Sequence, residues 1–90
     1  MPARKQPTHW YSVYVVAYVD DATRMRVERG EEVITQPEQI TAQSFYMGRS
    51  RAQAERNFSR AALAAMNNTL AYAVVMQRDH QVIIRVRVER

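Results

Sequence analysis

Arginine supplies almost all of the positive charge of this sequence, and four arginines stand at alternate positions in two strand-like stretches. Twelve of the thirteen Lys and Arg side chains are arginine. Arg24 and Arg26 lie in the stretch 24–29, and Arg85 and Arg87 lie in the stretch 82–88. Because alternate side chains of a strand point to the same face, the two arginines of each stretch are expected to share a face. A guanidinium offers a planar fork of donors and stacks on aromatic rings, which predicts contact with an acidic protein or a phosphate backbone.

Residues of the types that carry out catalysis are few and scattered. The chain has two histidines, His9 and His80, and no cysteine. Asp20 and Asp21 are adjacent and predict a turn more than a pair of catalytic carboxylates. Two glycines are too few for a glycine-rich phosphate loop. We therefore expect a protein that is not an enzyme, with no catalytic residue, no metal and no cofactor.

Composition predicts one small folded domain. The chain has 90 residues, 47% of them hydrophobic and 24% charged, with a net charge of +4 and a pI of about 10.0. Residues 1–9 are basic, contain two prolines and predict a flexible tail, and residues 10–90 predict a single α+β domain. The longest apolar run, 13–19, is about a third of a membrane span. We expect a cytoplasmic protein that does not enter a membrane.

Hydrophobic periodicity predicts strands and one long helix. The strands are expected over 10–19, 24–29, 40–47, 70–77 and 82–89, and the helix over 51–67. Ser50 is suited to be the N-cap of the helix, and Gln53 completes a capping box. The fold class is therefore α+β: an antiparallel sheet of four or five strands with one long helix packed on one face, in the order β-β-(β)-α-β-β.

The last two strands predict a hairpin whose two faces differ. With its turn near 78–81, Val75 lies opposite Ile84 and Ala73 lies opposite Val86. The helix is expected to cover the face that carries the small residues Ala71, Ala73 and Val75. The first strand is apolar on both sides, so one helix leaves an uncovered face with aromatic residues, methionine and arginine, the types enriched at interface cores. The predicted partner-binding residues on that face are Trp10, Tyr14, Tyr18, Tyr72, Met76, Arg85 and Arg87.

Other arginines are candidates for contacts with nucleic acid or an acidic partner. Arg24 and Arg26 join the uncovered face only in one register of the first hairpin, which the sequence leaves open. Arg49, Arg56 and Arg60 lie away from the apolar stripe of the helix, and such a face is also typical of a solvated surface.

The strand-to-helix segment resembles a known family. Gly48-x-Ser50-x-x-x-Ala54-x-x-Asn57-x-x-x-Ala61 is similar to the corresponding signature of HicB-type antitoxins, which bind a partner toxin. In size and element order the chain also resembles small phage-encoded inhibitors such as anti-CRISPR proteins, which act by occluding a host protein. These resemblances imply a binding role and no catalysis.

The sequence thus predicts a non-enzymatic protein that occupies a surface of a partner protein, as an inhibitor or regulator encoded by a phage or other mobile element. The same uncovered face also suits a homodimer. The alternative is a basic nucleic-acid-binding regulator that uses arginines and aromatic residues. Salt dependence separates the two classes, because phosphate contacts release counterions and weaken steeply as salt rises.

Overall fold

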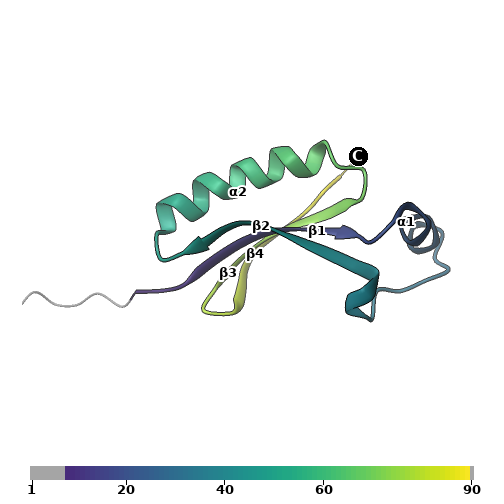
Figure 1. The fold of residues 1–90 in the computed structure, drawn as a ribbon, viewed down its shortest axis with the longest axis horizontal. Coiled ribbons are helices and arrows are strands. Elements are labelled where there is room, and N and C mark those ends of the chain that lie inside the picture. Colours follow the sequence, from purple (N-terminus) through teal and green to yellow (C-terminus); the bar gives the residue numbers. More distant parts are fainter. Residues whose placement is uncertain (1–7, 90) are drawn as a thin grey trace, which may run out of the picture.

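The computed structural model describes residues 8–89 as a four-stranded antiparallel sheet with two helices (Figure 1). In chain order the elements are β1 (Tyr11–Tyr18), α1 (Asp21–Glu28), a 3₁₀ turn (Pro37–Gln39), β2 (Ile40–Gly48), α2 (Arg51–Met66), β3 (Ala71–Arg78) and β4 (Gln81–Arg87). The strand order is β2-β1-β3-β4, so β1 and β3 are central while β2 and β4 are edge strands. The α+β class and the antiparallel sheet are confirmed.

The segment between β1 and β2 corrects the predicted element order. The expected turn over 20–23 and strand over 24–29 are wrong, because the chain forms α1 there. The order is therefore β-α-β-α-β-β, with four strands. Alternation over so short a stretch does not distinguish a strand from a short helix, and the signals that start the helix decide between them.

The start of α1 explains why this segment is helical. Asp20 has extended backbone angles, and its carboxylate accepts a hydrogen bond from the Thr23 N–H at 2.7 Å. Hydrogen bonding from Thr23, first from its side chain and then from its N–H, lowers the pKa of Asp20. Arg24 then forms ion pairs with Asp21 and Glu28 at helical spacing, with N–O distances of 2.7 and 2.9 Å. A strand would place Arg24 and Glu28 too far apart to pair.

The long helix begins as predicted but with a different set of hydrogen bonds. The Ser50 hydroxyl accepts a bond from the Gln53 N–H at 3.2 Å, which confirms the N-cap. The Ser50 N–H donates to the hydroxyl of Tyr46 at 3.0 Å, the position that a capping box assigns to the Gln53 side chain. Glycine at 48 leaves room for this tyrosine, because a Cβ there would collide with the Tyr46 hydroxyl.

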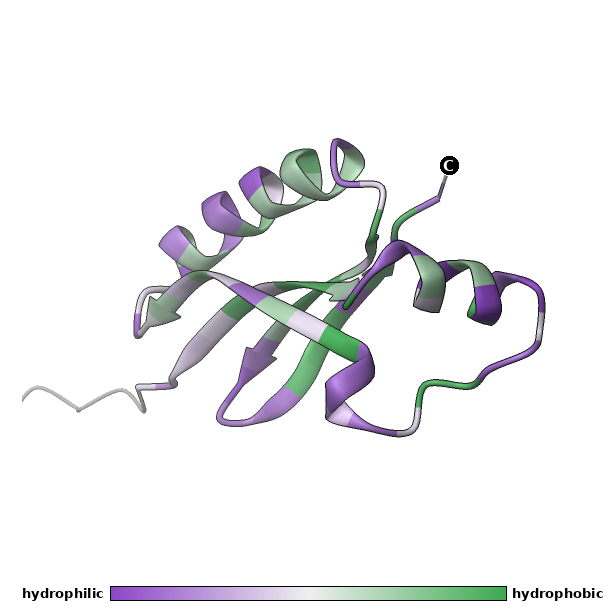
Figure 2. Cartoon of the chain, turned by 45° about the vertical axis from the view of Figure 1, so that its right-hand side comes forward, coloured by the Kyte–Doolittle hydropathy of each residue, from purple (hydrophilic) through white to green (hydrophobic). Residues whose placement is uncertain are grey.

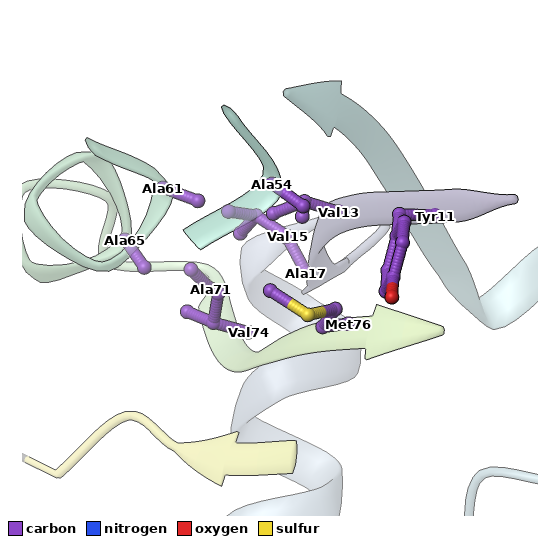
Figure 3. Packing of buried hydrophobic residues seen from close by; sticks show 10 residues of the cluster. All are labelled: Tyr11, Val13, Val15, Ala17, Ala54, Ala61, Ala65, Ala71, Val74 and Met76. Carbon is purple, nitrogen blue, oxygen red and sulfur yellow. The ribbon is translucent and has the colours of Figure 1, made fainter. Parts of the chain in front are cut away.

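The core lies between α2 and one face of the sheet (Figure 3). Ala54, Ala61 and Ala65 are fully buried on α2, so the helix backbone approaches the strands closely. The buried side chains of this cluster are Tyr11, Val13, Val15, Ala17, Ala54, Ala61, Ala65, Ala71, Val74 and Met76. Figure 2 shows hydrophobic residues concentrated in the sheet, while the first turns of α2 are largely hydrophilic.

The closing hairpin is confirmed, but its register is shifted by one residue. The turn at Asp79 and His80 has positive φ at both positions, 50° and 69°, as a two-residue hairpin turn of type I′ requires. A bulge beside Met76 and Gln77 then leaves Ile83 without a partner residue. Beyond the bulge Val75 pairs with Arg85, so the predicted pairing of Val75 with Ile84 is wrong.

The shift extends along the rest of β4. Ala73 pairs with Arg87 and Val74 pairs with Val86, so the predicted pairing of Ala73 with Val86 is also wrong. Val86 therefore lies on the side of α2, and the two arginines lie on the other side with Ala73 and Val75. The prediction of which hairpin side chains lie under the helix, and which lie on the opposite face of the sheet, is therefore only partly correct.

Candidate interaction face

The sheet face opposite α2, which we call the open face, has a small apolar cluster of its own. Val16, Ala73 and Val75 are buried there although no helix covers them. Tyr14, Ile40 and Tyr72 pack over them and remain half-exposed. The open face is therefore closed by side chains of its own strands, and their outer surfaces stay available.

The structure places five of the seven predicted binding residues on the open face: Tyr14, Tyr18, Tyr72, Arg85 and Arg87. Met76 is different, because it is completely buried beneath α2, so its predicted position on the open face is wrong. Trp10 precedes β1, at the end of the strand opposite to Tyr18, and it does not join the others.

Tyr18 and Tyr72 form the centre of this face. Their ring centroids are 4.6 Å apart with an interplanar angle of 31°. A second bulge, in β3 beside Val16 and Ala17, leaves Tyr72 without a partner residue in β1. Tyr72 and its neighbour Ala73 therefore both belong to the open face, which strict alternation forbids.

Arginines flank this tyrosine pair. Arg85 and Arg87 are exposed, and both line a hollow that also contains Tyr72. Burial raises the pKa of Tyr72, and the positive charge of Arg85 acts in the opposite direction.

A groove of about 630 Å³ extends from these residues toward α1. Its sheet side includes Tyr18, Tyr72, Arg85 and Arg87. Its other wall comes from Val27 and Glu28 of α1 and from Val33 and Ile34 of the following loop. Val33 is 73% exposed, and Figure 2 shows a short hydrophobic stretch in that loop. This wall was not predicted from the sequence. The feature that could have indicated it is Asp20, because aspartate is a common N-cap and α1 begins directly after it.

The remaining candidate arginines do not join the open face. Arg24 already holds two carboxylates of α1, and Arg26 binds Glu32 at 2.8 Å. Bonds from Arg26 and Gln39 lower the pKa of Glu32. These ion pairs stabilise α1 and the loop that follows it. Because Arg24 and Arg26 already bind carboxylates of their own chain, the geometry does not support their predicted contacts with a partner.

Arg49 lies over the Trp10 ring, with its guanidinium carbon 5.7 Å from the ring centroid, and donates to the Thr8 hydroxyl at 3.1 Å. This contact joins Trp10, from the predicted partner-binding face, to Arg49, one of the other candidate arginines. Arg56 and Arg60 are exposed on α2, on the opposite side of the molecule from the open face.

His9 has structural contacts, and His80 lies in the β3–β4 turn. His9 Nδ1 lies 2.6 Å from an Asp79 carboxylate oxygen, and the Trp10 N–H donates to the other oxygen at 2.9 Å. These two bonds, the Trp10 bond first, lower the pKa of Asp79. The chain entering β1 is thereby attached to the β3–β4 turn. Of the predicted tail 1–9, residues 1–7 lie outside the described residues.

Within residues 8–89 no group of three or more His, Cys, Asp or Glu side chains is arranged to hold a metal ion. No helix in the same range is long and apolar enough to span a membrane. Comparison of the chain with family models, with curated proteins and with solved structures found no match. The resemblances to HicB-type antitoxins and to anti-CRISPR proteins stay predictions.

Proposed function

We propose that this protein binds a partner protein through its open face and acts by occupying the partner's surface. The observation that carries the proposal is a half-exposed tyrosine pair flanked by two exposed arginines on a sheet face that α2 does not cover. Tyrosine and arginine are the side chains that dominate binding energy at protein interfaces. Such a protein serves as an inhibitor or regulator, and the small inhibitors that phages encode are the expected class.

The charge of the face indicates the chemistry of the partner. Among the described residues, Arg24, Arg26 and Arg51 are in ion pairs with carboxylates, whereas Arg85 and Arg87 have none within 4.0 Å. An interface that buries these two guanidinium groups needs acceptors on the other side. The partner surface is therefore acidic, with apolar groups that cover Tyr18 and Tyr72.

A charge reversal tests this proposal. Arg85→Glu together with Arg87→Glu is expected to leave the fold intact, because surface changes usually cost less than about 0.5 kcal/mol. The immobilised parent chain should capture a partner from a lysate of its native host, and the double variant should lose that partner. Arg56→Glu with Arg60→Glu makes the same charge change on α2 and should retain it. Equal capture by all three chains would exclude the open face.

The same residues also fit the alternative of a nucleic-acid-binding regulator. A tyrosine pair can stack bases, and adjacent arginines can hold phosphates. A labelled single-stranded oligonucleotide, titrated with the parent chain at low and high salt, distinguishes the two. Binding that weakens steeply with salt and is lost in the Arg85 and Arg87 variant would favour the alternative. No binding at low salt leaves the acidic protein surface as the target.

A further inference from the structure

The two edges of the sheet expose backbone groups with very different side chains beside them. In antiparallel strands, residues alternate between those bonded to the neighbour and those whose N–H and C=O point away from it. The Val19 N–H donates to the Gln39 C=O at 2.9 Å, in register with the pairing of β1 and β2. Gln39, Thr41 and Gln43 therefore face β1, and the backbones of the alternate residues Ile40, Ala42 and Ser44 point outward.

At the other edge the outward residues are charged. The Val88 N–H donates to the Tyr72 C=O at 2.9 Å, in register with the pairing of β3 and β4. By the same alternation, Arg85 and Arg87 direct their backbones away from β3. Two copies joined through β4 would bring arginines opposite arginines, which destabilises a strand pair. This edge is protected against self-association by charge.

The β2 edge has no such protection over its first half. Ile40–Gly48 contains no charged residue, and residues 41–44 are exposed. Natural edge strands usually carry charges, prolines or bulges that prevent pairing with another chain. The bulge at Phe45 interrupts only the second half of β2, since it lies between the pairs of Ser44 and Tyr46. An uncharged segment without a bulge, and with outward backbone groups, remains over 40–44.

We propose that a second copy of this chain pairs with β2 along this segment, antiparallel and about a two-fold axis at Ala42. In that register the two Ala42 residues exchange both of their N–H and C=O groups. The Ile40 C=O of each copy accepts from the Ser44 N–H of the other. The Ile40 N–H needs no partner there, because it already donates to the Pro37 C=O.

The side chains of the segment are compatible with a second copy. Ala42 is the smallest chiral residue and stands beside its own copy at the axis. On one face Ile40 meets Ser44, and on the other Thr41 meets Gln43, so no like charges are opposed. The result is a closed dimer with a continuous sheet, in which both open faces lie on the same side. This inference is independent of the function proposed for the open face.

Charge substitutions at the axis test the register. Ala42→Lys places two lysines opposite each other and should weaken dimerisation about tenfold or more, as Ala42→Glu should, because like charges are opposed. A mixture of the two variants should restore the dimer. Met47→Lys adds the same charge to an exposed position of β2 beyond the bulge and should dimerise like the parent. Sedimentation equilibrium measures the association, and circular dichroism verifies folding.

Several results would overturn the proposal: a parent chain that is monomeric at every concentration, an Ala42→Lys variant that dimerises like the parent, or a mixture that stays monomeric. Stronger association of Ala42→Glu alone would show that β2 pairs with the arginine edge of β4 instead.

Amide hydrogen exchange supplies a test that needs no variant. The N–H groups of Ala42 and Ser44 should exchange fast in dilute solution and more slowly as concentration rises. Those of Thr41 and Gln43 should be protected at all concentrations, because they face β1. Exchange at Ala42 and Ser44 that does not change with concentration would contradict the pairing.

Discussion

The two faces of the sheet are closed in different ways. Under α2, alanines bring the helix backbone close, and Met76, Val13 and Val74 are almost completely buried. On the open face, tyrosines of the strands lie over Val16, Ala73 and Val75 and stay half-exposed. The first face gains its stability from the exclusion of water within one chain. The second face is covered only by the side chains of its own strands. It keeps a groove and two arginines, Arg85 and Arg87, that form no ion pair among residues 8–89.

This difference separates stability from binding in the molecule. Substitutions beneath α2 should change the free energy of unfolding, whereas substitutions on the open face should chiefly change association.

Truncation of a core side chain should have the largest effect. Met76→Ala removes a completely buried side chain and leaves a cavity, which typically costs about 2–5 kcal/mol. Tyr72→Ala is the comparison on the open face, and it should cost less because its ring is half-exposed. Urea unfolding of both variants measures the two losses. An equal or larger loss for Tyr72→Ala would mean that the open face is as much a core as the face beneath α2.

Loss of the α2 cap should have an intermediate effect. Ser50→Ala removes the acceptor of the Gln53 N–H and should cost about 1 kcal/mol in thermal or urea unfolding. Ser59→Ala, on an exposed part of the same helix, is the control and should change stability little. An unfolding curve of Ser50→Ala that matches the parent would mean that the N-cap contributes nothing to the free energy of unfolding.

Acidification should produce the smallest and most local change, at α1. Hydrogen bonds lower the folded pKa of Asp20 and Glu32. A lowered folded pKa contributes stability above the unfolded value, about 4, and this contribution is lost as pH falls through the folded pKa. The protection of α1 amides against exchange, relative to the intrinsic rate at each pH, should therefore fall in acid before that of α2 amides does. Asp20→Asn should remove part of that pH dependence, and unchanged acid behaviour would argue against the cap.

Long periodic segments of the chain were predictable, and short ones were not. The α2 helix has a cap, a stripe of alanines and enough turns to show its period, and its predicted range differs from the observed one only at the last residue. α1 has about two turns, and its charged residues alternate as they would in a strand. The deciding feature is the side chain of Asp20, which caps the helix through its bond to Thr23. Aspartate is also common in turns, so the sequence alone does not distinguish the two roles.

Both arginines of the open face were predicted correctly, but the predicted pairing of their strand was not. Strict alternation placed Arg85 and Arg87 with Tyr72, and the structure keeps these three residues together. It does so through two bulges, one in β4 and one in β3, which change the partners of both strands. Met76 was assigned to the wrong face by the same alternation. A bulge has no reliable signature in a single sequence, because it depends on how neighbouring strands fit.

The position of β1 has a consequence for folding. β1 is a central strand, yet it precedes the other three strands in the chain, and β3 is separated from it by α1, β2 and α2. Closing the sheet therefore depends on contacts of high sequence separation, whose loop-closure entropy slows folding relative to local hairpins. During synthesis β1 is apolar on both sides before either neighbour exists. Its apolar side chains therefore stay exposed in the nascent chain until β2 and β3 are available to pair with it.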